Sequence, residues 1–402
     1  MTKLLDKKTL KTHYGAHALT ELEVLKGLCE GLDCAGEELA ILTQYLEAGV
    51  KCPDVSDSFY EHVNAEAEHQ KSFEFIDLFA GLGGFRLALN GLGGQCLFSS
   101  EWEPNAKSAY FANHNVFPFG DINKFTGDNL SDNRLGALVP SHDILAAGFP
   151  CQPFSLAGVS ARNSLGKPHG LECNTQGTLF RSIERIAKVK KPKLLLLENV
   201  RNIISHDGGR TFEVIKNAIE KVGYKFFHDI VSAETVVPQK RVRCFMVCVR
   251  DDIHAQSGDF VFPEFFGQPL ALSTIIRKNV DPRFTISEAL WAGHQKRSKR
   301  NKARGTGFTT GLADLTKPSN TIVARYGKDG KECLIPQEGT TPRMLSIEEC
   351  RDLFGYPTGF KLPTAKTVAF KLLGNSVVVP VVQSIAAKMV KQYLDLPKSF
   401  DR

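Results

Sequence analysis

The sequence has no uninterrupted apolar run long enough to cross a bilayer, and its first residues lack the apolar segment of a secretion signal. Its ten cysteines show neither the paired spacings of a zinc site nor those of a disulfide framework. No internal repeat is visible. These absences argue against a membrane-spanning, metal-binding or disulfide-stabilised protein. We expect a cytoplasmic protein with reduced thiols and no bound metal.

Size and composition are those of a globular chain. The 402 residues, 42% of them hydrophobic, can bury a full core in one large domain or two. The net charge of +6 is compatible with a polyanionic partner, but many metabolic enzymes are equally basic. Composition alone therefore leaves the function open.

Residues 1–70 follow a pattern of their own. Leucines recur there at helical spacing, and Gly49 and Pro53 end the pattern, which predicts a small helical extension. Two roles fit such an extension: a packing appendage, or a pair of helices that contacts DNA. The pattern leaves both open.

The rest of the chain divides into segments with different hydrophobic patterns. From Phe73 to Arg250, short apolar segments alternate with helical segments. This predicts a doubly wound α/β domain over 71–250, with a parallel sheet covered on both faces and ligands at the carboxyl ends of the strands. The rhythm is lost over 251–341, and a helical pattern returns within 342–402.

A glycine-rich turn follows the first apolar strand, in "DLFAGLGGFRLAL". Gly81, Gly83 and Gly84 let the backbone turn tightly and approach a ligand closely. The spacing is GxGG rather than the GxGxxG of dinucleotide sites. The turn alone is therefore weak evidence for a nucleotide.

The next two strand ends carry acids. Glu101 ends the second strand, where a carboxylate can accept hydrogen bonds from ribose hydroxyls, and Trp102 beside it can lie against a purine ring. Asp121 follows a third short strand and can receive an adenine amino group. Each acid alone is compatible with an ordinary loop. Together with the glycine turn they predict an adenosine-bearing cofactor without a phosphate clamp, and S-adenosylmethionine fits.

A cysteine between two prolines follows a further apolar strand, in "DILAAGFPCQPFSLAG". Pro150 and Pro153 fix φ on both sides of Cys151 and make the loop stiff. A cysteine there is a nucleophile if it is partly exposed and its thiolate is favoured. The alternative is a small buried hydrophobe, which we expect for Cys96, Cys244, Cys248, Cys333 and Cys350.

Two further polar groups lie at the ends of apolar strands. "LLLLENV" ends in Glu198 and Asn199, and a partly desolvated glutamate holds its proton more tightly and can act as an acid toward a ring nitrogen. In "VVPQKRVRCFMV", alternation predicts Gln239, Arg241 and Arg243 on one face. Arginine forks suit a carbonyl or phosphate oxygen, although a solvated strand face is the alternative.

These groups answer one chemical problem, the methylation of C5 of cytosine. C5 is a poor nucleophile, but addition of a thiolate at C6 makes an enamine that can take a methyl group. A glutamic acid at N3 eases the addition, and an arginine at O2 holds the ring. Because C6 is inaccessible in a duplex, the base must be flipped out.

From about Phe73 to Met389 the chain resembles the DNA (cytosine-5) methyltransferase family of the bacterial modification type. The matching segments occur in the family's order: "DLFAGLGGFRLAL", "SSEWEPNA", "GDINKF", "AAGFPCQPFSLAG", "GTLF", "ENV", "QKRVR", "TPRMLSIEECRDLFGYP" and "LLGNSVVVPVVQSIA". Any one match is modest, and the ordered set is specific. Before "GTLF" the family usually has an acid and an arginine where this chain has "NTQ".

The resemblance implies roles for particular residues. The catalytic set would be Cys151, Glu198, Arg241 and Arg243. The set that binds S-adenosylmethionine would be Phe79, Gly81, Gly83, Glu101, Trp102, Asp121, Ile122, Pro150, Leu179, Asn375 and Ser376. The set that contacts the base or the DNA would be Gln152, Ser155, Asn199, Gln239 and Arg343.

The resemblance also implies an architecture and partners. Residues 251–341 would be a target-recognition domain, and 342–402 would complete the catalytic domain. Double-stranded DNA would lie in a cleft. The basic run "HQKRSKRNKAR" at 294–304 has six basic residues and no acid, so we expect it to touch phosphate, with a solvated surface loop as the alternative. We expect a monomer that modifies the site cut by a cognate restriction endonuclease, without contacting it. The alternatives are a tRNA cytosine-5 methyltransferase of the same fold and an inactive DNA-binding relative.

Overall fold

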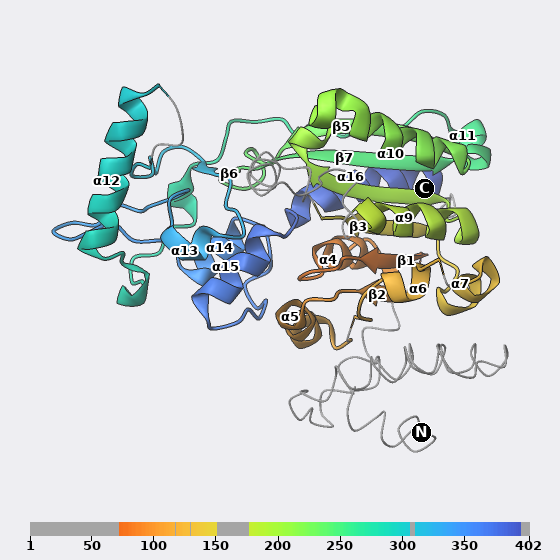
Figure 1. Ribbon diagram of the computed structural model, residues 1–402, viewed down its shortest axis with the longest axis horizontal. Coiled ribbons are helices and arrows are strands. Elements are labelled where there is room, and N and C mark those ends of the chain that lie inside the picture. The colour runs from red at the N-terminus through yellow and green to blue at the C-terminus, as the bar shows by residue number, and fades with distance from the viewer. Residues whose placement is uncertain (1–71, 117, 129, 151–176, 306–309, 395–402) are drawn as a thin grey trace, which may run out of the picture. The chain divides into compact units, whose positions relative to one another are not determined.

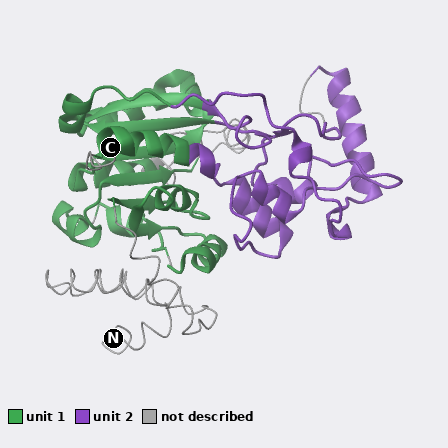
Figure 2. Cartoon of the chain, turned by 180° about the vertical axis from the view of Figure 1, so that it is seen from behind, with its two compact units in different colours: residues 1–230, 243–262, 383–402 green, residues 231–242, 263–382 purple. Residues whose placement is uncertain are grey.

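The computed structural model describes residues 72–394 except 117, 129, 151–176 and 306–309 (Figure 1). The described residues form two compact units (Figure 2). Unit 1 takes those within 1–230, 243–262 and 383–402, and unit 2 takes 231–242 and 263–382. Residues 342–382 therefore cluster with the segment before them. Of the stretch expected to complete the catalytic domain, only the part after Val382 joins unit 1.

Unit 1 is built on a six-stranded sheet in the order β2-β1-β3-β4-β7-β5. The strands are β1 (Phe73–Leu78), β2 (Gly94–Ser100), β3 (Ile144–Gly148), β4 (Leu194–Val200), β5 (Tyr224–Ser232) and β7 (Val242–Arg250). β1 pairs parallel with β2 and with β3, and β3 pairs parallel with β4. The doubly wound α/β fold is confirmed.

The prediction of an all-parallel sheet is wrong at β7, which runs antiparallel to β4. β7 is buried along most of its length, like a central parallel strand. A near-continuous apolar run marks burial on both faces, but it carries no information on the direction of the strand.

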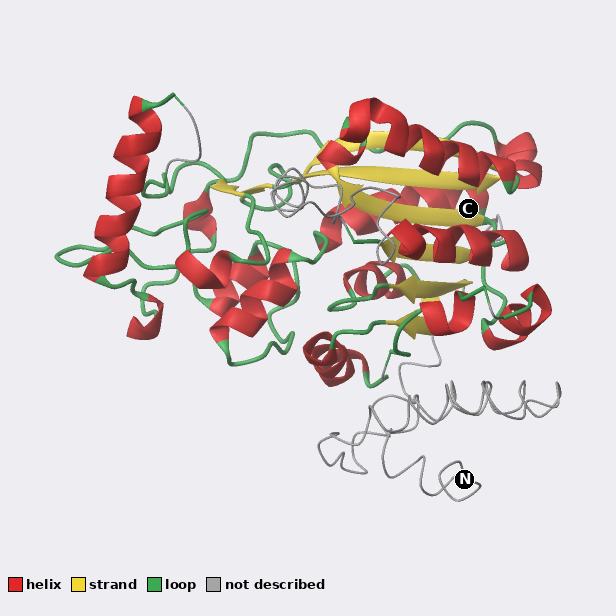
Figure 3. Ribbon diagram, viewed as in Figure 1, coloured by secondary structure: helices red, strands yellow, loops and turns green. Residues whose placement is uncertain are grey.

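Helices cover both faces of this sheet (Figure 3). They are α4 (Gly84–Asn90), α5 (Pro104–His114), α6 (Asn123–Thr126), α7 (Asp132–Leu138), α9 (Gly177–Lys190), α10 (Arg210–Lys221) and the end of α16 (Val379–Tyr393). The short helix α11 (Asp251–Ser257) follows β7 and has no buried residue. Two short 3₁₀ turns, η2 (Arg201–Ile203) and η3 (His206–Gly209), lead from β4 into α10.

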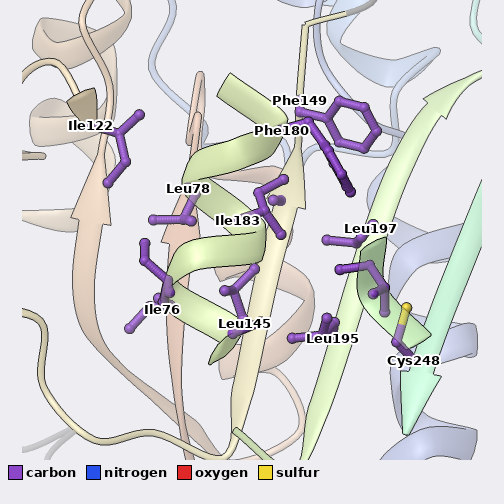
Figure 4. Close-up of a cluster of buried hydrophobic side chains, with 14 of the residues drawn as sticks. Ile76, Leu78, Ile122, Leu145, Phe149, Phe180, Ile183, Leu195, Leu197 and Cys248 are labelled. Carbon is purple, nitrogen blue, oxygen red and sulfur yellow. The ribbon is translucent and has the colours of Figure 1, made fainter. Parts of the chain in front are cut away.

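The main core lies between the sheet and α6, α7, α9 and α10 (Figure 4). Ile76, Leu145 and Leu195 pair across the strands in register. Because strand side chains alternate, these residues point to one face, where Phe180 and Ile183 of α9 pack on them. Each such side chain contributes about 1.5–3 kcal/mol on burial. This packing fixes the carboxyl ends of the strands.

Unit 2 has little regular structure. A two-stranded parallel sheet joins β6 (Gln239–Lys240) to β8 (Ser319–Asn320). Its helices are η4 (Leu272–Thr274), η5 (Pro282–Phe284), α12 (Glu288–Ala303), α13 (Tyr326–Asp329), α14 (Ile347–Asp352) and α15 (Lys366–Gly374). The first residues of α16 also belong to this unit.

The basic run lies mostly in α12, although the sequence showed no regular period there. Ser287 caps the helix by accepting a hydrogen bond from the backbone of Leu290. Its buried face carries His294 and Ser298 instead of apolar residues. Because the helical period is read from apolar side chains, this polar face concealed the helix.

The segment Lys366–Tyr393 is long and apolar enough to cross a membrane by length and composition. However, 61% of its most apolar window is buried inside the protein. The helical geometry is also broken between Gly374, which ends α15, and Val379, which begins α16. Packing in the core therefore accounts for its apolar character.

Candidate active site

The glycine turn after β1 is tightly built. Phe79, Gly81 and Gly83 all adopt positive φ, at 57°, 55° and 78°. A Cβ on Gly83 would lie 2.3 Å from Nε2 of His114, so only glycine fits there. A Cβ on Gly81 would meet only the carbonyl oxygen of Phe79, at 3.9 Å. Side chains therefore fill the space next to Gly83, whereas the space next to Gly81 is open and leaves room for a ligand.

His114 supports this turn from α5. Its Nε2–H donates to the carbonyl oxygen of Leu82 at 3.2 Å. Burial, together with the charge of Arg86, lowers the pKa of His114 to about 3. Arg86 in turn donates to the hydroxyl of Tyr110 at 3.1 Å. A neutral histidine and a buried arginine thus hold the turn in place from behind.

Glu101, at the end of β2, is fixed by backbone donors. One carboxylate oxygen accepts from the N–H of Gly81 and the other from the N–H of Glu103, both at 2.8 Å. Burial raises the pKa of Glu101. Trp102 follows it and is 77% exposed. The turn and the acid expected to bind one ligand are therefore joined directly.

The third strand end is less regular than expected. Phe119 forms a single parallel bridge with Ser100 in place of a strand. Asp121 is exposed, and its Oδ1 accepts from the backbone and the side chain of Asn123 at 3.0 and 2.9 Å. Ile122 is buried in the core, so its side chain is used for packing.

Phe79 and Leu179 lie at the edge of the same core. Both are partly buried and pack against the main cluster. They come from the glycine turn and the first turn of α9, which are far apart in the sequence. Two of the residues expected around the cofactor thus pack on the same core from different elements.

The carboxyl ends of β3 and β4 lie side by side. Gly148 is the register partner of Glu198. The side chain of Asn199 donates to the carbonyl oxygen of Phe149 at 3.3 Å and accepts from the N–H of Val200 at 2.8 Å. Asn199, expected to contact the base, is thus buried. Its side chain is hydrogen-bonded to Phe149, the residue with which the loop after β3 begins.

That loop carries the expected nucleophile. Pro150 is its last described residue and is partly buried. Cys151, Gln152 and Ser155 lie outside the described residues. The hydrogen bond of Asn199 is therefore made two residues before Cys151, at the root of its loop.

Glu198 forms an ion pair with Arg243. The guanidinium Nε lies 3.0 Å from Oε1 of the carboxylate, and both side chains are largely buried. The antiparallel pairing of β7 with β4 makes this possible, because it sets Arg243 opposite Val200. The fold thereby brings two of the expected catalytic residues together.

Gln239 and Arg241 engage other partners, although they alternate with Arg243. Gln239 is buried in unit 2, where its amide accepts from the N–H of Ile322 and donates to the carbonyl of Leu353. Arg241 is also buried and donates to backbone carbonyls of unit 2. The alternation in the sequence therefore predicted one shared face for three side chains that contact different segments in the structure.

The remaining expected residues also lie in unit 2. Arg343 makes a bidentate ion pair with buried Glu349, with both N–O distances at 2.8 Å. Asn375 is exposed at the end of α15. Ser376 is buried and its hydroxyl lies 2.5 Å from that of Tyr356. Arg343 thus braces unit 2, and Asn375 alone of these three presents an exposed side chain.

Sequence reasoning missed the supports of the glycine turn. Asp77 is fully buried in β1 beside Arg86, and desolvation raises its pKa well above the usual value. An acid within the apolar run "FEFIDLF" was the available signal. Nothing in the pattern around Tyr110 and His114 marked them.

The cysteines in the described part of the chain are those that we expected to be small buried hydrophobes. Five are buried and free, as predicted: Cys96, Cys244, Cys248, Cys333 and Cys350. Burial raises the pKa of Cys244 and of Cys333 to about 12. They are held as inert thiols.

The sheet order, the glycine turn and the acid at the end of β2 define the class. This is the Rossmann-like fold of S-adenosylmethionine-dependent methyltransferases. The family model described as C-5 cytosine-specific DNA methylase matches residues 73–391. The chain therefore belongs to this family, and it is a DNA (cytosine-5-)-methyltransferase.

Curated relatives agree over most of the chain. The type II methyltransferase M.SsoII of Shigella sonnei is 41% identical over 321 residues, covering 79% of this chain and 80% of its own. M.NlaX of Neisseria lactamica is 41% identical, with 79% and 96% covered. The DNA-cytosine methyltransferase of Escherichia coli K12 is 34% identical, with 92% and 90% covered. This last alignment extends beyond residues 73–391.

Solved structures support the fold. The Dnmt2 methyltransferase of S. pombe superimposes with a TM-score of 0.60 at 17% identity, covering 79% of this chain and 98% of its own. A DNMT2 mutant of Spodoptera frugiperda gives 0.61 at 19% identity, with 79% and 99% covered. At this identity the likeness concerns the fold alone.

Proposed function

We propose that this enzyme transfers a methyl group to C5 of a flipped-out cytosine in duplex DNA through a covalent adduct between Cys151 and C6. The observation that carries the proposal is the ion pair of Glu198 with Arg243, 3.0 Å apart at the end of β4. The bond from Asn199 to Phe149 holds the root of the cysteine loop beside it. An acid, a cation and the start of a nucleophile loop thus converge on one strand end.

The chemistry follows from these positions. The thiolate of Cys151 adds to C6 while Glu198 gives a proton to N3, and the electron pair then resides at C5 as an enamine. Arg243 orients Glu198 and hydrogen-bonds O2 of the ring. C5 then takes the methyl group from the sulfonium donor, which departs as a neutral thioether. A base removes the C5 proton, the thiolate leaves C6, and N3 returns its proton to Glu198. The base must leave the stack because C6 is covered in a duplex.

The residues of the glycine turn fit S-adenosylmethionine, which supplies an electrophilic methyl group when bound. The open side of Gly81 leaves room for it, and the fixed carboxylate of Glu101 can accept from ribose hydroxyls. Exposed Trp102 offers a face to the purine, and Asp121 an acceptor to the adenine amino group. Pro150, Ile122, Phe79, Leu179, Asn375 and Ser376 complete the proposed set. These residues bind and orient the donor.

The biological setting is proposed from the relatives. Several are type II methyltransferases, so we infer a cytoplasmic, monomeric modification enzyme that protects the site of a cognate restriction endonuclease. We further infer that the target-recognition segment 251–341 reads the DNA sequence through its larger part, 263–341, which lies in unit 2 and carries the basic helix α12. Double-stranded DNA is the proposed partner.

Transfer of a tritiated methyl group tests the proposal. Purified enzyme should label plasmid DNA, leave tRNA unlabelled and place the label on cytosines at one sequence, identified by bisulfite sequencing. Labelled tRNA would favour the RNA-modifying alternative. No label on either substrate, with intact binding to DNA, would favour an inactive relative.

A further inference from the structure

Arg241 brackets Asn375. Its Nη2 donates to the carbonyl of Gly374 at 3.2 Å and to the carbonyl of Ser376 at 2.6 Å, the residues on either side of that asparagine. The arginine side chain is buried, at 3% exposed, and stacks over the ring of Phe354 at 4.9 Å. One guanidinium therefore fixes the turn that ends α15.

The other end of the fork holds a separate segment. Nη1 of Arg241 donates to the carbonyl of Ile322 at 3.1 Å, and the N–H of Ile322 donates to Gln239 at 2.9 Å. The pairing of β6 with β8 docks the residues just before Ile322 onto the same strand. Both backbone groups of Ile322 are thus held from the segment that contains Arg241.

These two anchored segments touch. A Cβ on Gly374 would lie 2.3 Å from the backbone N of Ala324 and from the carbonyl carbon of Val323. The turn at the end of α15 therefore cannot shift toward this segment. It can move away only by breaking the hydrogen bonds of Arg241.

Asn375 is presented by this arrangement. Gly374 and Ser376 are buried, and the residues up to Val379 are buried too, whereas Asn375 is exposed. Its backbone N–H bonds the carbonyl of Lys371 at 3.3 Å, so the helix end aims its side chain outward. The hydrogen bonds of Arg241 hold the carbonyls of Gly374 and Ser376. The direction of the Asn375 side chain depends on these two neighbouring peptide units.

We propose that Arg241 is a positioning residue for cofactor binding, which acts by holding Asn375 in its binding geometry. The inference rests on the proposed function, in which Asn375 binds S-adenosylmethionine. It replaces the base-holding role expected from the alternation of Gln239, Arg241 and Arg243. Only arginine supplies a planar fork that reaches three carbonyls from two segments.

The variant Arg241→Lys tests this, with Arg243→Lys as the matched control two residues away. A lysine keeps the charge but cannot span the three carbonyls. Calorimetry with S-adenosylhomocysteine should show affinity about tenfold weaker in Arg241→Lys and within about twofold of wild type in Arg243→Lys. Steady-state kinetics should show a raised KM for S-adenosylmethionine in Arg241→Lys and a lowered kcat in Arg243→Lys.

A double-mutant cycle with Asn375→Ala separates positioning from general loosening. If Arg241 acts through Asn375, Arg241→Lys weakens binding in the wild-type background and adds little in the Asn375→Ala background. Equal losses in both backgrounds would overturn the proposal. So would wild-type affinity in Arg241→Lys with a reduced kcat, since that is the signature of a base-holding residue.

A second variant covers a failure to fold. If Arg241→Lys shows no cooperative melting, Phe354→Leu takes its place, because it removes the ring beneath the guanidinium and keeps the site apolar. Weaker binding of S-adenosylhomocysteine by this variant supports the positioning role of Arg241, and unchanged binding overturns it. A wild-type chain that binds no S-adenosylhomocysteine would instead contradict the proposed function itself. The two failures are therefore distinguishable.

Discussion

Glu198 lies at the end of β4 with its Oε1 3.0 Å from Nε of Arg243, and it is the general acid of the proposed mechanism. Glu198→Gln keeps the shape of the side chain but removes the ionisable group. Methyl transfer at saturating cofactor should fall by about 10²- to 10⁴-fold, the usual contribution of a general acid. Affinity for S-adenosylhomocysteine should stay near wild type. A rate within a few-fold of wild type would remove Glu198 from the mechanism.

Asp77 predicts a pH-dependent stability. Burial raises its pKa well above 3.8, so the native state holds a proton that the unfolded chain has released. The stability that this proton contributes is complete below pH 4 and decreases as pH rises toward the native pKa. The melting temperature of Asp77→Asn relative to wild type should therefore rise between pH 4 and pH 7. A constant difference would show that Asp77 is ionised in the native state.

At the scale of single residues, part of the candidate site could be predicted from the sequence. Glu101 and Glu198 could be predicted because an acid directly after an apolar strand lies at a strand end, where ligands bind in this fold. The contacts of Arg241 could not. Its partners Ile322, Gly374 and Ser376 are 81, 133 and 135 residues away, and no local pattern encodes such pairs.

The element that most invites a test is α12. His294 and Ser298 bury one face through hydrogen bonds to Asp329 and Thr310. Exposed basic residues cover much of the rest: Lys296, Lys299, Arg300, Lys302 and Arg304. Arg297 is less exposed and lies 3.7 Å from Asp329. The outward face therefore suits the phosphates of DNA.

Changing Lys296, Lys299 and Arg300 to alanine together should weaken binding to target and non-target duplexes alike. Removing one ionic interaction with a phosphate lowers the slope of log affinity against log salt by about one. The methylated sequence should not change, since phosphate contacts carry no sequence information. Lys221→Ala with Lys225→Ala, two exposed lysines of unit 1, is the control. An unchanged slope contradicts the phosphate role, and a changed methylation site would mean that α12 reads bases.

Element existence was predictable where apolar periodicity was strong, as for β1, β3 and β4. It failed for α12, whose buried side chains are polar, and for the direction of β7, which burial does not encode. Both failures bear on function. The antiparallel direction of β7 places Arg243 beside Glu198. The buried face of α12 is polar, and the basic residues of this helix are therefore left exposed.

Across the whole molecule, buried neutral histidines predict sensitivity to acid. Burial lowers the pKa of His114 to about 3 and of His142 to about 4. Both contribute stability that is present above their ordinary pKa of 6.5 and is lost as pH falls toward the native values. Unfolding should therefore become easier between pH 6.5 and pH 4.

His142→Gln isolates this effect. A glutamine can still donate to the carbonyl of Pro140, which His142 contacts at 2.8 Å, but it takes up no proton on unfolding. The loss of stability with falling pH should be smaller in the variant by up to about 1.4 kcal/mol per pH unit. Denaturant unfolding at several pH values measures it. Parallel curves for the two proteins would show that His142 is charged in the native state.

The central claim concerns the whole enzyme: that Cys151 forms a covalent bond with the base it methylates. Duplex DNA carrying 5-fluorocytosine at the target should trap the wild-type enzyme in the presence of S-adenosylmethionine, because fluorine at C5 cannot be removed as a proton. The complex should survive denaturing electrophoresis, and Cys151→Ser should yield none. A trap of equal yield with Cys151→Ser, or no trap with an active wild-type enzyme, would contradict the account.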